Sequence, residues 1–326
     1  MLPPLDDLLA TARVVALPLA SRFRRVDVRE ALLLEGPNGW TEFSPFTEYG
    51  DAESAAWLAA AVDFGWGILP PLVRDSVRVN ATLPSVAPDA VPGVLDRFPG
   101  CRTVKVKVAE PGQVLADDVA RVAAARAYLG PEGRVRVDAN GGWNVDEAER
   151  AVHALAPFDL EYVEQPCATV DELAELRERI AYLDIPIAAD ESVRKADDPL
   201  AVARAGAADL LVIKAQPLGG IAAALRIVTE AGLPVVVSSA LDTSVGISMG
   251  LHLAAAIPRL EFDCGLATAS LLAADVTGEP LLPVDGMLPV RRVDADLVGL
   301  HAADGERERW WLDRLERCYA LLERMP

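Results

Sequence analysis

The middle of this sequence repeats one unit eight times, and this repeat constrains the fold more than any other feature. Each unit is a short run of β-branched residues ending in a polar residue, then a turn with Gly, Pro or Asp, then an Ala- and Leu-rich stretch. Successive runs end 24 to 31 residues apart, which is the length that a strand, a helix and two loops need in a parallel array. The runs end at Asn80, Lys107, Asp138, Glu164, Asp190, Lys214, Ser239 and Asp263.

Eight such units predict an α/β fold with a closed, TIM-like barrel of the (β/α)7β type. After Asp263 the period lapses into ASLLAADVTGEPLLPVDG, which contains no full-length helical stretch, so we expect the last unit to be truncated. The competing arrangement is an open doubly wound sheet. That fold normally carries a G-x-G-x-x-G turn after an early strand, and the sequence has none.

The ends of the chain lack the repeat and predict a second, smaller domain. Residues 1 to 78 contain an apolar run (ALLLEG), a turn at Pro37 and Asn38 and a helical stretch near Ala52 to Val62, which indicates a small α+β domain. From about Asp285 the chain runs into a charged, aromatic-bearing helix (RERWWLDRLERCYALLERM) that we expect to pack on the body. The predicted division is therefore 1–78, joined by part of 285–326, and a barrel over 79–284.

Charge and cysteine content limit the partners of the chain. With 31 Lys and Arg against 49 Asp and Glu, the net charge of −18 repels nucleic acid and anionic membranes. A small anionic substrate is still compatible, because local cations can reverse the potential within one pocket. The four cysteines form no C-x-x-C pair, Asp6 and Asp7 stand where a signal peptide needs positive charge, and no long apolar run occurs. We expect a cytoplasmic monomer or small homo-oligomer with no nucleic-acid or membrane partner.

Carboxylates at three successive run ends predict a metal site. In a parallel barrel the carboxyl ends of the strands surround one mouth, where the active site lies. Asp138, Glu164 and Asp190 would meet there and would supply only oxygen ligands, which favours Mg²⁺, with Mn²⁺ as an alternative. Buried charges must be paired or hold a metal, so a ring of structural salt bridges is the other interpretation of the same residues.

Lysines flank these carboxylates and suggest acid–base chemistry. Side chains alternate along a strand, so Lys105 and Lys107 point to the barrel axis while the intervening valines face the helices. A lysine base must lose its proton near neutral pH, and a neighbouring cation such as Lys105 lowers the pKa of Lys107 in that direction. With Lys214, the set suits proton abstraction next to a carboxylate.

Further residues near the run ends are candidates for substrate binding or for orienting this site. Asn140 and Glu191 lie close enough in sequence to orient Lys107 or a metal ligand, and loop hydrogen bonding is their alternative role. Arg136 would point inward with Asp138, as a structural ion pair or as a guide for an anionic substrate. The remaining candidates are Ser238 and Ser239, which precede a helix-starting turn (ALDTSVG) whose N–H groups could hold a distal carboxylate, and Asp263 at the eighth run end.

The segments TVKVKV, VRVDANGGW, YVEQP, IAADES and LVIKAQPLGG resemble the enolase superfamily, and within it the muconate-lactonizing subgroup. That subgroup carries K-x-K on the second barrel strand, Asp, Glu and Asp on the third to fifth, and Lys on the sixth. The resemblance implies a Lys base working with Mg²⁺ and a capping domain over the barrel mouth. It therefore implies that Lys107 and Lys214 are catalytic and that Asp138, Glu164 and Asp190 bind the metal.

The early segment GWTEFSPFTEY further resembles the capping domain of the subgroup's carbon–oxygen lyases of menaquinone synthesis. This likeness implies that Lys107 removes the proton alpha to the carboxylate of a hydroxycyclohexadiene acid and then protonates the departing hydroxyl. Lys214 would hold its ammonium group against the enediolate. The loop around Ser21 to Val26 would control which substrate enters.

Other activities of the same subgroup use the same five residues, so they stay open. They are N-acylamino acid racemase, dipeptide epimerase and muconate cycloisomerase, and fold analogy cannot separate them. Dipeptide epimerases carry Asp-x-Asp near the eighth strand, where this chain reads FDCGLAT, which counts against that activity. A non-catalytic metal-binding barrel is a further alternative. It is disfavoured because inward lysines beside carboxylates carry a desolvation cost unless their charge is used.

Overall fold

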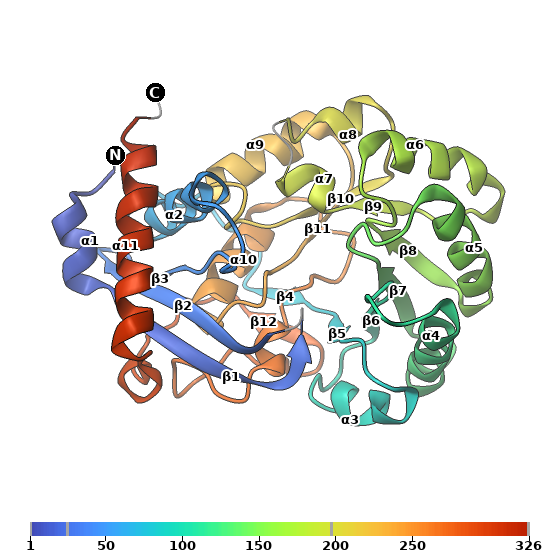
Figure 1. The fold of residues 1–326 in the computed structure, drawn as a ribbon, viewed down its shortest axis with the longest axis horizontal. Helices are drawn as coiled ribbons and strands as arrows, with labels where there is room; N and C mark the ends of the chain where they lie inside the picture. The colour runs from blue at the N-terminus through green and yellow to red at the C-terminus, as the bar shows by residue number, and fades with distance from the viewer. Residues whose placement is uncertain (1, 24–25, 196–197, 325–326) are drawn as a thin grey trace.

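A parallel sheet of seven strands forms the body of the protein, seen in Figure 1 with its helices on the outside. The computed structural model describes residues 2–23, 26–195 and 198–324. Neighbouring strands follow the chain order without exception, from β5 at one edge to β11 at the other. The strands are β5 (Ala81–Leu83), β6 (Thr103–Lys107), β7 (Arg134–Asp138), β8 (Leu160–Glu164), β9 (Ile187–Ala189), β10 (Leu210–Ile213) and β11 (Val235–Val237).

A short eighth segment closes this sheet into a barrel. Cys264 pairs in parallel with Val79, just before β5, and Gly265 pairs in parallel with Ser238, just after β11. A 3₁₀ turn, η4 (Thr268–Leu271), follows where the other units have a helix. The predicted (β/α)7β barrel with a truncated last unit is therefore confirmed.

Helices cover the outside of the barrel after each of the first seven strands (Figure 1). Their starts follow local sequence signals. Asn144 and Glu147 form a reciprocal capping box at α5, and Thr169 and Glu172 form another at α6. The helical segments are η1 (Pro88–Ala90), α3 (Val91–Leu95), α4 (Leu115–Leu129), α5 (Val145–Leu155), η2 (Ala156–Phe158), α6 (Val170–Arg179), η3 (Ala181–Leu183), α7 (Glu191–Arg194), α8 (Ala201–Arg204), α9 (Ile221–Ala231) and α10 (Ser244–Ala256).

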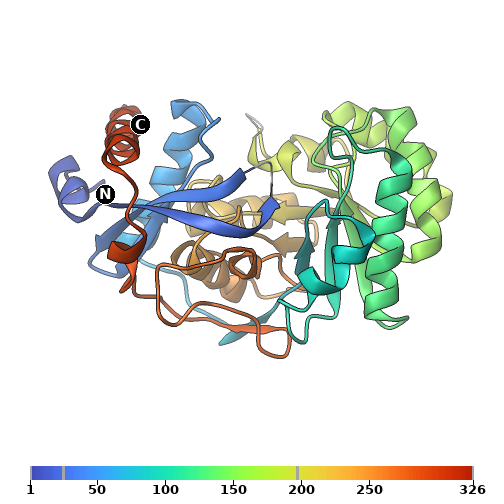
Figure 2. The same cartoon turned by 60° about the horizontal axis from the view of Figure 1, so that its bottom comes forward.

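The first part of the chain builds a small antiparallel domain, here called the capping domain. Its sheet has the order β1-β2-β3, and the β1–β2 hairpin extends toward β5 and α3 (Figure 2). The C-terminal helix α11 packs on α2, so the two ends of the chain lie in the same domain (Figure 1). The elements are α1 (Leu5–Thr11), β1 (Arg13–Phe23), β2 (Val26–Gly36), β3 (Gly39–Phe43), α2 (Asp51–Trp66), η5 (Val298–His301) and α11 (Gly305–Leu322).

One predicted strand end is wrong. The run that ends at Asn80 first forms β4 (Ser76–Arg78), which pairs with β12 (Met287–Pro289) in a separate antiparallel ribbon. The chain then stays extended through Asn80, whose N–H donates to the Cys264 carbonyl, and enters β5. Asn80 therefore lies at the amino-terminal end of the first barrel strand and not at the mouth. The sequence could not reveal this, because two short strands in succession read as one run.

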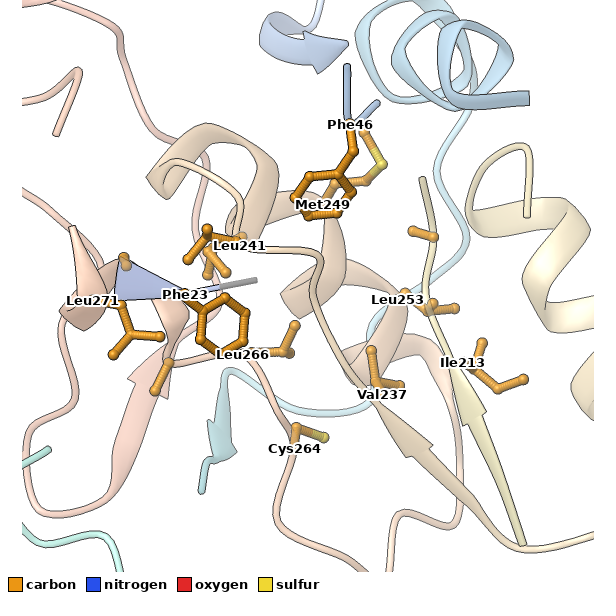
Figure 3. Close-up of a cluster of buried hydrophobic side chains, with 14 of the residues drawn as sticks. Phe23, Phe46, Ile213, Val237, Leu241, Met249, Leu253, Cys264, Leu266 and Leu271 are labelled. Carbon is orange, nitrogen blue, oxygen red and sulfur yellow. The ribbon is translucent and has the colours of Figure 1, made fainter. Parts of the chain in front are cut away.

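The capping domain and the barrel share one hydrophobic core. Figure 3 shows Phe23 and Phe46 of the capping domain in the same cluster as Leu241 and Met249 of the barrel. All four side chains are buried. The two parts are therefore held together by apolar packing, which is the largest favourable term in folding. Among the described residues, no helix combines the length and the apolar character needed to cross a membrane.

Arg314 on α11 gives a test of how the C-terminal helix holds the capping domain. Its buried guanidinium donates to four acceptors in the segment before and within α2: the carbonyls of Pro45, Phe46 and Tyr49 and the hydroxyl of Ser54. Arg314→Met leaves these acceptors unsatisfied and should lower the free energy of unfolding by about 3 kcal/mol in urea denaturation.

Arg317→Met is the matched control on the same helix. Its side chain is half exposed and pairs with Asp51 at the surface, so we expect a change within about 0.5 kcal/mol. Equal effects from the two substitutions would mean that the buried hydrogen bonds do not stabilise this junction.

Candidate active site

Three of the four lysines in the sequence meet three buried carboxylates at the barrel mouth. Lys105 Nζ lies 2.6 Å from Glu164 Oε1 and 3.2 Å from Asp138 Oδ2. Lys107, two residues along β6, donates to the same Asp138 oxygen. Lys214 and Asp190 are 2.6 Å apart, so each of the three carboxylates is paired with a lysine.

Strand geometry brings these side chains together. Lys107 and Asp138 are opposite each other in the β6–β7 register, and Asp138 is opposite Glu164 in the β7–β8 register. Equivalent positions at the ends of parallel strands point to the same side, so their side chains converge. Asp190 and Lys214 directly follow β9 and β10. The predicted convergence of charged residues is what the structure contains.

Burial and the neighbouring charges shift the pKa values of the carboxylates in opposite directions. Burial raises the pKa of Asp138, but the ammonium groups of Lys107 and Lys105 outweigh it and hold this pKa well below its usual range. Burial also raises the pKa of Asp190, and Lys214 and Arg194 outweigh it in the same way. Glu164 differs, because burial and the charge of Asp138 together raise its pKa to about 7.

The two lysines of β6 are also unequal. Burial lowers the pKa of Lys107, and the neighbouring charge of Lys105 lowers it further, against the opposing effect of Asp138. For Lys105, the charges of Glu164 and Asp138 outweigh burial and raise the pKa. Lys107 is therefore the lysine whose proton is easier to remove.

A network of hydrogen bonds holds Lys107 and the carboxylates in place. Asn140 accepts from Lys107 Nζ at 2.7 Å, and its own N–H donates to Asp138 Oδ1 at 3.0 Å. Its amide nitrogen donates to Glu191 at 3.1 Å. Asn140 has a φ of +48°, a left-handed conformation that Asn tolerates better than most residues. Asn140 and Glu191 thus lie beside the site, where the sequence placed them.

Arg194 is a part of this network that the sequence reasoning missed. It is buried on the short helix α7 and donates to Asp190 at 3.0 Å and to Glu191 at 2.6 Å. The available signal was its position four residues after Asp190, because residues four apart lie on one face of a helix. With Arg194 included, four cations face four carboxylates: Lys105, Lys107, Lys214 and Arg194 against Asp138, Glu164, Asp190 and Glu191.

The three carboxylates offer the oxygen ligands that suit a hard cation, although in this structure each is paired with a lysine. As placed, no three Asp, Glu, His or Cys side chains in the described part of the chain stand close enough to share a metal ion. The observed arrangement is the ring of structural salt bridges that the sequence analysis gave as the alternative to a metal site. That ring is incomplete, because within the described residues Glu164 Oε2 is buried without a hydrogen-bond partner. An additional cation beside Glu164 would pair with this oxygen and would lower the raised pKa of the carboxylate.

The pocket at this mouth is walled by both domains. Phe23, at the end of β1, places its ring 5.7 Å from Lys107 Nζ. It therefore lies at the entrance; residues 24 and 25 of the predicted specificity loop, Ser21 to Val26, are outside the described residues. The lining residues are Phe23, Thr82, Lys105, Lys107, Asn140, Arg194, Lys214, Ser238, Ser239, Ala240, Leu241 and Thr268, and Arg22, Pro84, Ser85 and Glu110 surround a hollow beside it.

Two predicted site residues lie away from the mouth. Asp263 precedes the closing segment and accepts a hydrogen bond at 2.6 Å from Thr103, the first residue of β6. Arg136 points to the barrel axis one layer below Asp138, where its described partners are Glu161, Asn80 and the Asp263 carbonyl. Asp263 lies at the amino-terminal end of the eighth barrel strand, because the pairing of that strand begins at Cys264. Arg136 forms a structural ion pair with Glu161 in the interior of the barrel.

Ser238 and Ser239 lie at the pocket, but their own backbone N–H groups are used by the barrel. Both side chains line the pocket, while the Ser238 N–H donates to the Ile213 carbonyl and the Ser239 N–H to the Gly265 carbonyl. The first of these hydrogen bonds extends the β10–β11 pairing, and the second joins β11 to the closing segment. At the end of the turn that follows, Glu42 of the capping domain accepts the N–H of Thr243 at the start of α10, so this N–H group is not open to a ligand.

Comparison with known proteins defines the class of this chain. Residues 95–295 match the family model for the enolase C-terminal domain-like fold, and residues 14–65 match the enolase N-terminal domain-like model. Among solved structures, the muconate lactonizing enzyme from Pseudomonas putida superimposes with a TM-score of 0.74 at 20% identity, covering 90% of this chain and 98% of that one. The L-Ala-D/L-Glu epimerase from Bacillus subtilis gives 0.73 at 24%, covering 87% and 96%. These two likenesses show the fold.

Sequence relatives are much closer. The o-succinylbenzoate synthase of Mycobacterium ulcerans is 56% identical over 323 residues, covering 98% of this chain and 97% of the relative. That of Mycobacterium tuberculosis is 56% identical over 325 residues, covering 99% and 98%. The chain belongs to the enolase superfamily and, within it, to the family of the o-succinylbenzoate synthases.

A substitution of Lys105 tests whether the ion pairs at the barrel mouth stabilise the fold. Lys105→Met leaves Glu164 and Asp138 with less compensation in a buried place, and breaking a buried pair costs about 3–5 kcal/mol. We expect a loss of that size in urea denaturation with EDTA present. Lys195→Met is the control, since Lys195 is more exposed and its ion pair with Glu53 is long, at 3.8 Å. This substitution should change stability by less than about 0.5 kcal/mol. Unchanged stability in Lys105→Met would show that the carboxylates are compensated without it.

Proposed function

We propose that this chain catalyses the reaction of the o-succinylbenzoate synthases. The reaction is the elimination of water from 2-succinyl-6-hydroxy-2,4-cyclohexadiene-1-carboxylate to give 2-succinylbenzoate. The observation that carries the proposal is that Lys107 and Lys214 line one pocket beside three buried carboxylates. The 56% identity to named synthases over nearly the whole chain supports this particular reaction.

Lys107 is the proposed base. In its neutral form it takes the proton alpha to the substrate carboxylate, so the C–H bond breaks and its electron pair moves onto the carboxylate, which becomes an enediolate. This pair then forms the new ring double bond as the C–O bond to the hydroxyl breaks, and Lys107 returns the proton to the departing oxygen, so that water leaves and the ring becomes aromatic. Burial and Lys105 lower the pKa of Lys107, which favours the neutral form that this step needs.

Lys214 is proposed to remain an ammonium group. It is held by Asp190 and approaches the pocket from β10, on the other side of the mouth from β6. A fixed positive charge there stabilises the negative charge that develops on the substrate when the proton is removed. A charge positioned in advance needs no reorganisation during the reaction.

We propose that Asp138, Glu164 and Asp190 hold Mg²⁺, with Mn²⁺ as an alternative. Oxygen-only ligands and the orphaned Glu164 Oε2 support a hard cation. A bound divalent ion would supply charge that stabilises the developing enediolate. The precursor of the proposed reaction carries two carboxylates, so a small anionic dicarboxylate is the proposed substrate class.

We further propose a cytoplasmic location, supported by the four free thiols, which persist in a reducing compartment. The expectations of a monomer or small homo-oligomer, and of no nucleic-acid or membrane partner, stay predictions.

The test of the proposed reaction is a comparison of two assays on the purified protein with Mg²⁺. One follows the ultraviolet change on aromatisation of the cyclohexadiene precursor, and the other follows racemisation of an N-acylamino acid, the runner-up activity that two lysines in one pocket also permit. Dehydration should exceed racemisation clearly in kcat/KM. Dominant racemisation would replace the proposed reaction, and inactivity in both assays would favour a binding protein.

In the dehydration assay, Lys107→Ala should fold normally and lose about 10³-fold or more in kcat, because it removes the group that moves the proton. Lys195→Ala is the control, since Lys195 is the one lysine of the sequence that does not pair with the carboxylates at the barrel mouth. This variant should keep near-normal turnover. Near-normal turnover in Lys107→Ala would remove this residue from the mechanism.

Metal dependence is tested by binding as well as by activity. EDTA-treated protein should be inactive and recover with Mg²⁺ or Mn²⁺. At 100 times its dissociation constant the ion should raise the free energy of unfolding by about 2.7 kcal/mol. Asp190→Asn should weaken this stabilisation. If the ion neither stabilises the protein nor restores turnover, the three carboxylates serve only as partners of the lysines.

A further inference from the structure

Two charged residues of the capping domain contact one wall of the pocket from behind. The wall is the segment 238–243, which follows β11, and its first four residues line the pocket. Arg29 on β2 and Glu42 on β3 reach this segment, and both are buried. We infer that Arg29 and Glu42 are positioning residues that fix this wall and thereby set which substrates the pocket accepts.

Arg29 holds the backbone where the wall is strained. Its Nε donates to the Leu241 carbonyl at 2.9 Å. Leu241 has a φ of +64°, a conformation that is unfavourable for a bulky residue and persists only when its surroundings impose it. The Leu241 side chain packs in the shared core that contains Phe23 (Figure 3). The hydrogen bond from Arg29 is therefore one of the forces that keep this conformation.

Glu42 holds the other end of the wall, where α10 begins. Its Oε2 accepts the N–H groups of Thr243 and Gly246, each at 3.1 Å, and the Thr243 hydroxyl. A carboxylate at a helix N-terminus satisfies free N–H groups and interacts favourably with the helix dipole. The fit is close, because a Cβ on Gly246 would lie 2.8 Å from the Glu42 carboxyl carbon.

Ser44 joins the two contacts into one unit. Its hydroxyl donates to Glu42 Oε1 and accepts from Arg29 Nη2 at 2.9 Å. Arg29, Glu42 and Ser44 belong to the capping domain, whereas Leu241 and Thr243 belong to the barrel. Movement of the capping domain relative to the barrel would therefore move the pocket wall with it.

The protonation state of Glu42 determines which substitutions are informative. Burial and the nearby Asp242 raise the pKa of Glu42 to about 7, against the opposing charge of Arg29, and burial also raises the pKa of Asp242. Glu42→Gln keeps one oxygen to accept from α10 and resembles the protonated form. Glu42→Ala removes the acceptor, so the pair separates loss of charge from loss of the contact.

The experiment compares Arg29→Met, Glu42→Ala and Glu42→Gln with a control at the same helix end. Asp275 accepts from the Ser244 N–H at 3.2 Å and from its hydroxyl at 2.6 Å, but it comes from the segment that follows η4 and not from the capping domain. Asp275→Ala should destabilise the start of α10 without touching residues 238–242. All variants are measured in the full-length protein.

The first readout is amide hydrogen exchange of the peptide covering residues 238–246, followed by mass spectrometry. Arg29→Met and Glu42→Ala should raise its exchange about tenfold or more, the size expected from losing one buried hydrogen bond. Glu42→Gln should stay near the parent. In Asp275→Ala the increase should be confined to the amides from Ser244 onward. Unchanged exchange at 238–242 in both Arg29→Met and Glu42→Ala would overturn the inference.

The second readout is kinetic, and its choice of substrates rests on the proposed function. Arg29→Met and Glu42→Ala should raise KM for the cyclohexadiene precursor about tenfold with kcat within about threefold, because Lys107 and the carboxylates are untouched. The ratio of dehydration to racemisation should change, and Glu42→Gln should restore both values. A loss of stability with KM unchanged would assign these residues a structural role only. If the parent catalyses neither reaction, the proposed function fails, while hydrogen exchange still decides whether the wall is held.

Discussion

Compensation of buried charge is the constraint on which the rest of this structure depends. Lys105 and Lys214 are buried at the barrel mouth together with Asp138, Glu164 and Asp190, Lys107 beside them is largely buried, and none of these charges could be buried alone. The parallel strands of the barrel solve this problem, because their ends bring each of the three carboxylates within contact distance of a lysine. The desolvation that makes the arrangement costly also lowers the pKa of Lys107, so the same burial that limits stability favours the neutral form that the proposed proton transfer needs.

The capping domain completes the site from outside the barrel. Its hairpin brings Phe23 to the entrance, and its residues Arg29 and Glu42 contact the wall after β11. These contacts are buried and continuous with the shared core (Figure 3). The barrel therefore carries the groups proposed for proton transfer, while the shape of the pocket depends on how the two parts pack. This division explains how one charge constellation can serve several reactions within a superfamily.

Much of the barrel was predictable because its signals are local and periodic. The alternation that placed Lys105 and Lys107 on one face follows from strand geometry, and the spacing of the run ends follows from the length of a β/α unit. Asp263 shows where this reasoning stops. A polar residue that begins a strand and one that ends a strand look alike in sequence, and only the pairing of Cys264 and Gly265 with their neighbours distinguishes them.

The sequence by itself determined the barrel, the charged residues at its mouth and the presence of a small second domain, since each depends on periodicity or on the order of residue types along the chain. Only the tertiary structure decided the contacts between distant segments. It showed that Glu42 rather than a ligand occupies the start of α10, that Arg194 joins Asp190, and that Arg136 pairs with Glu161. Such contacts depend on how the barrel closes and how the domains pack, and no local pattern encodes a pairing between residues brought together only by folding.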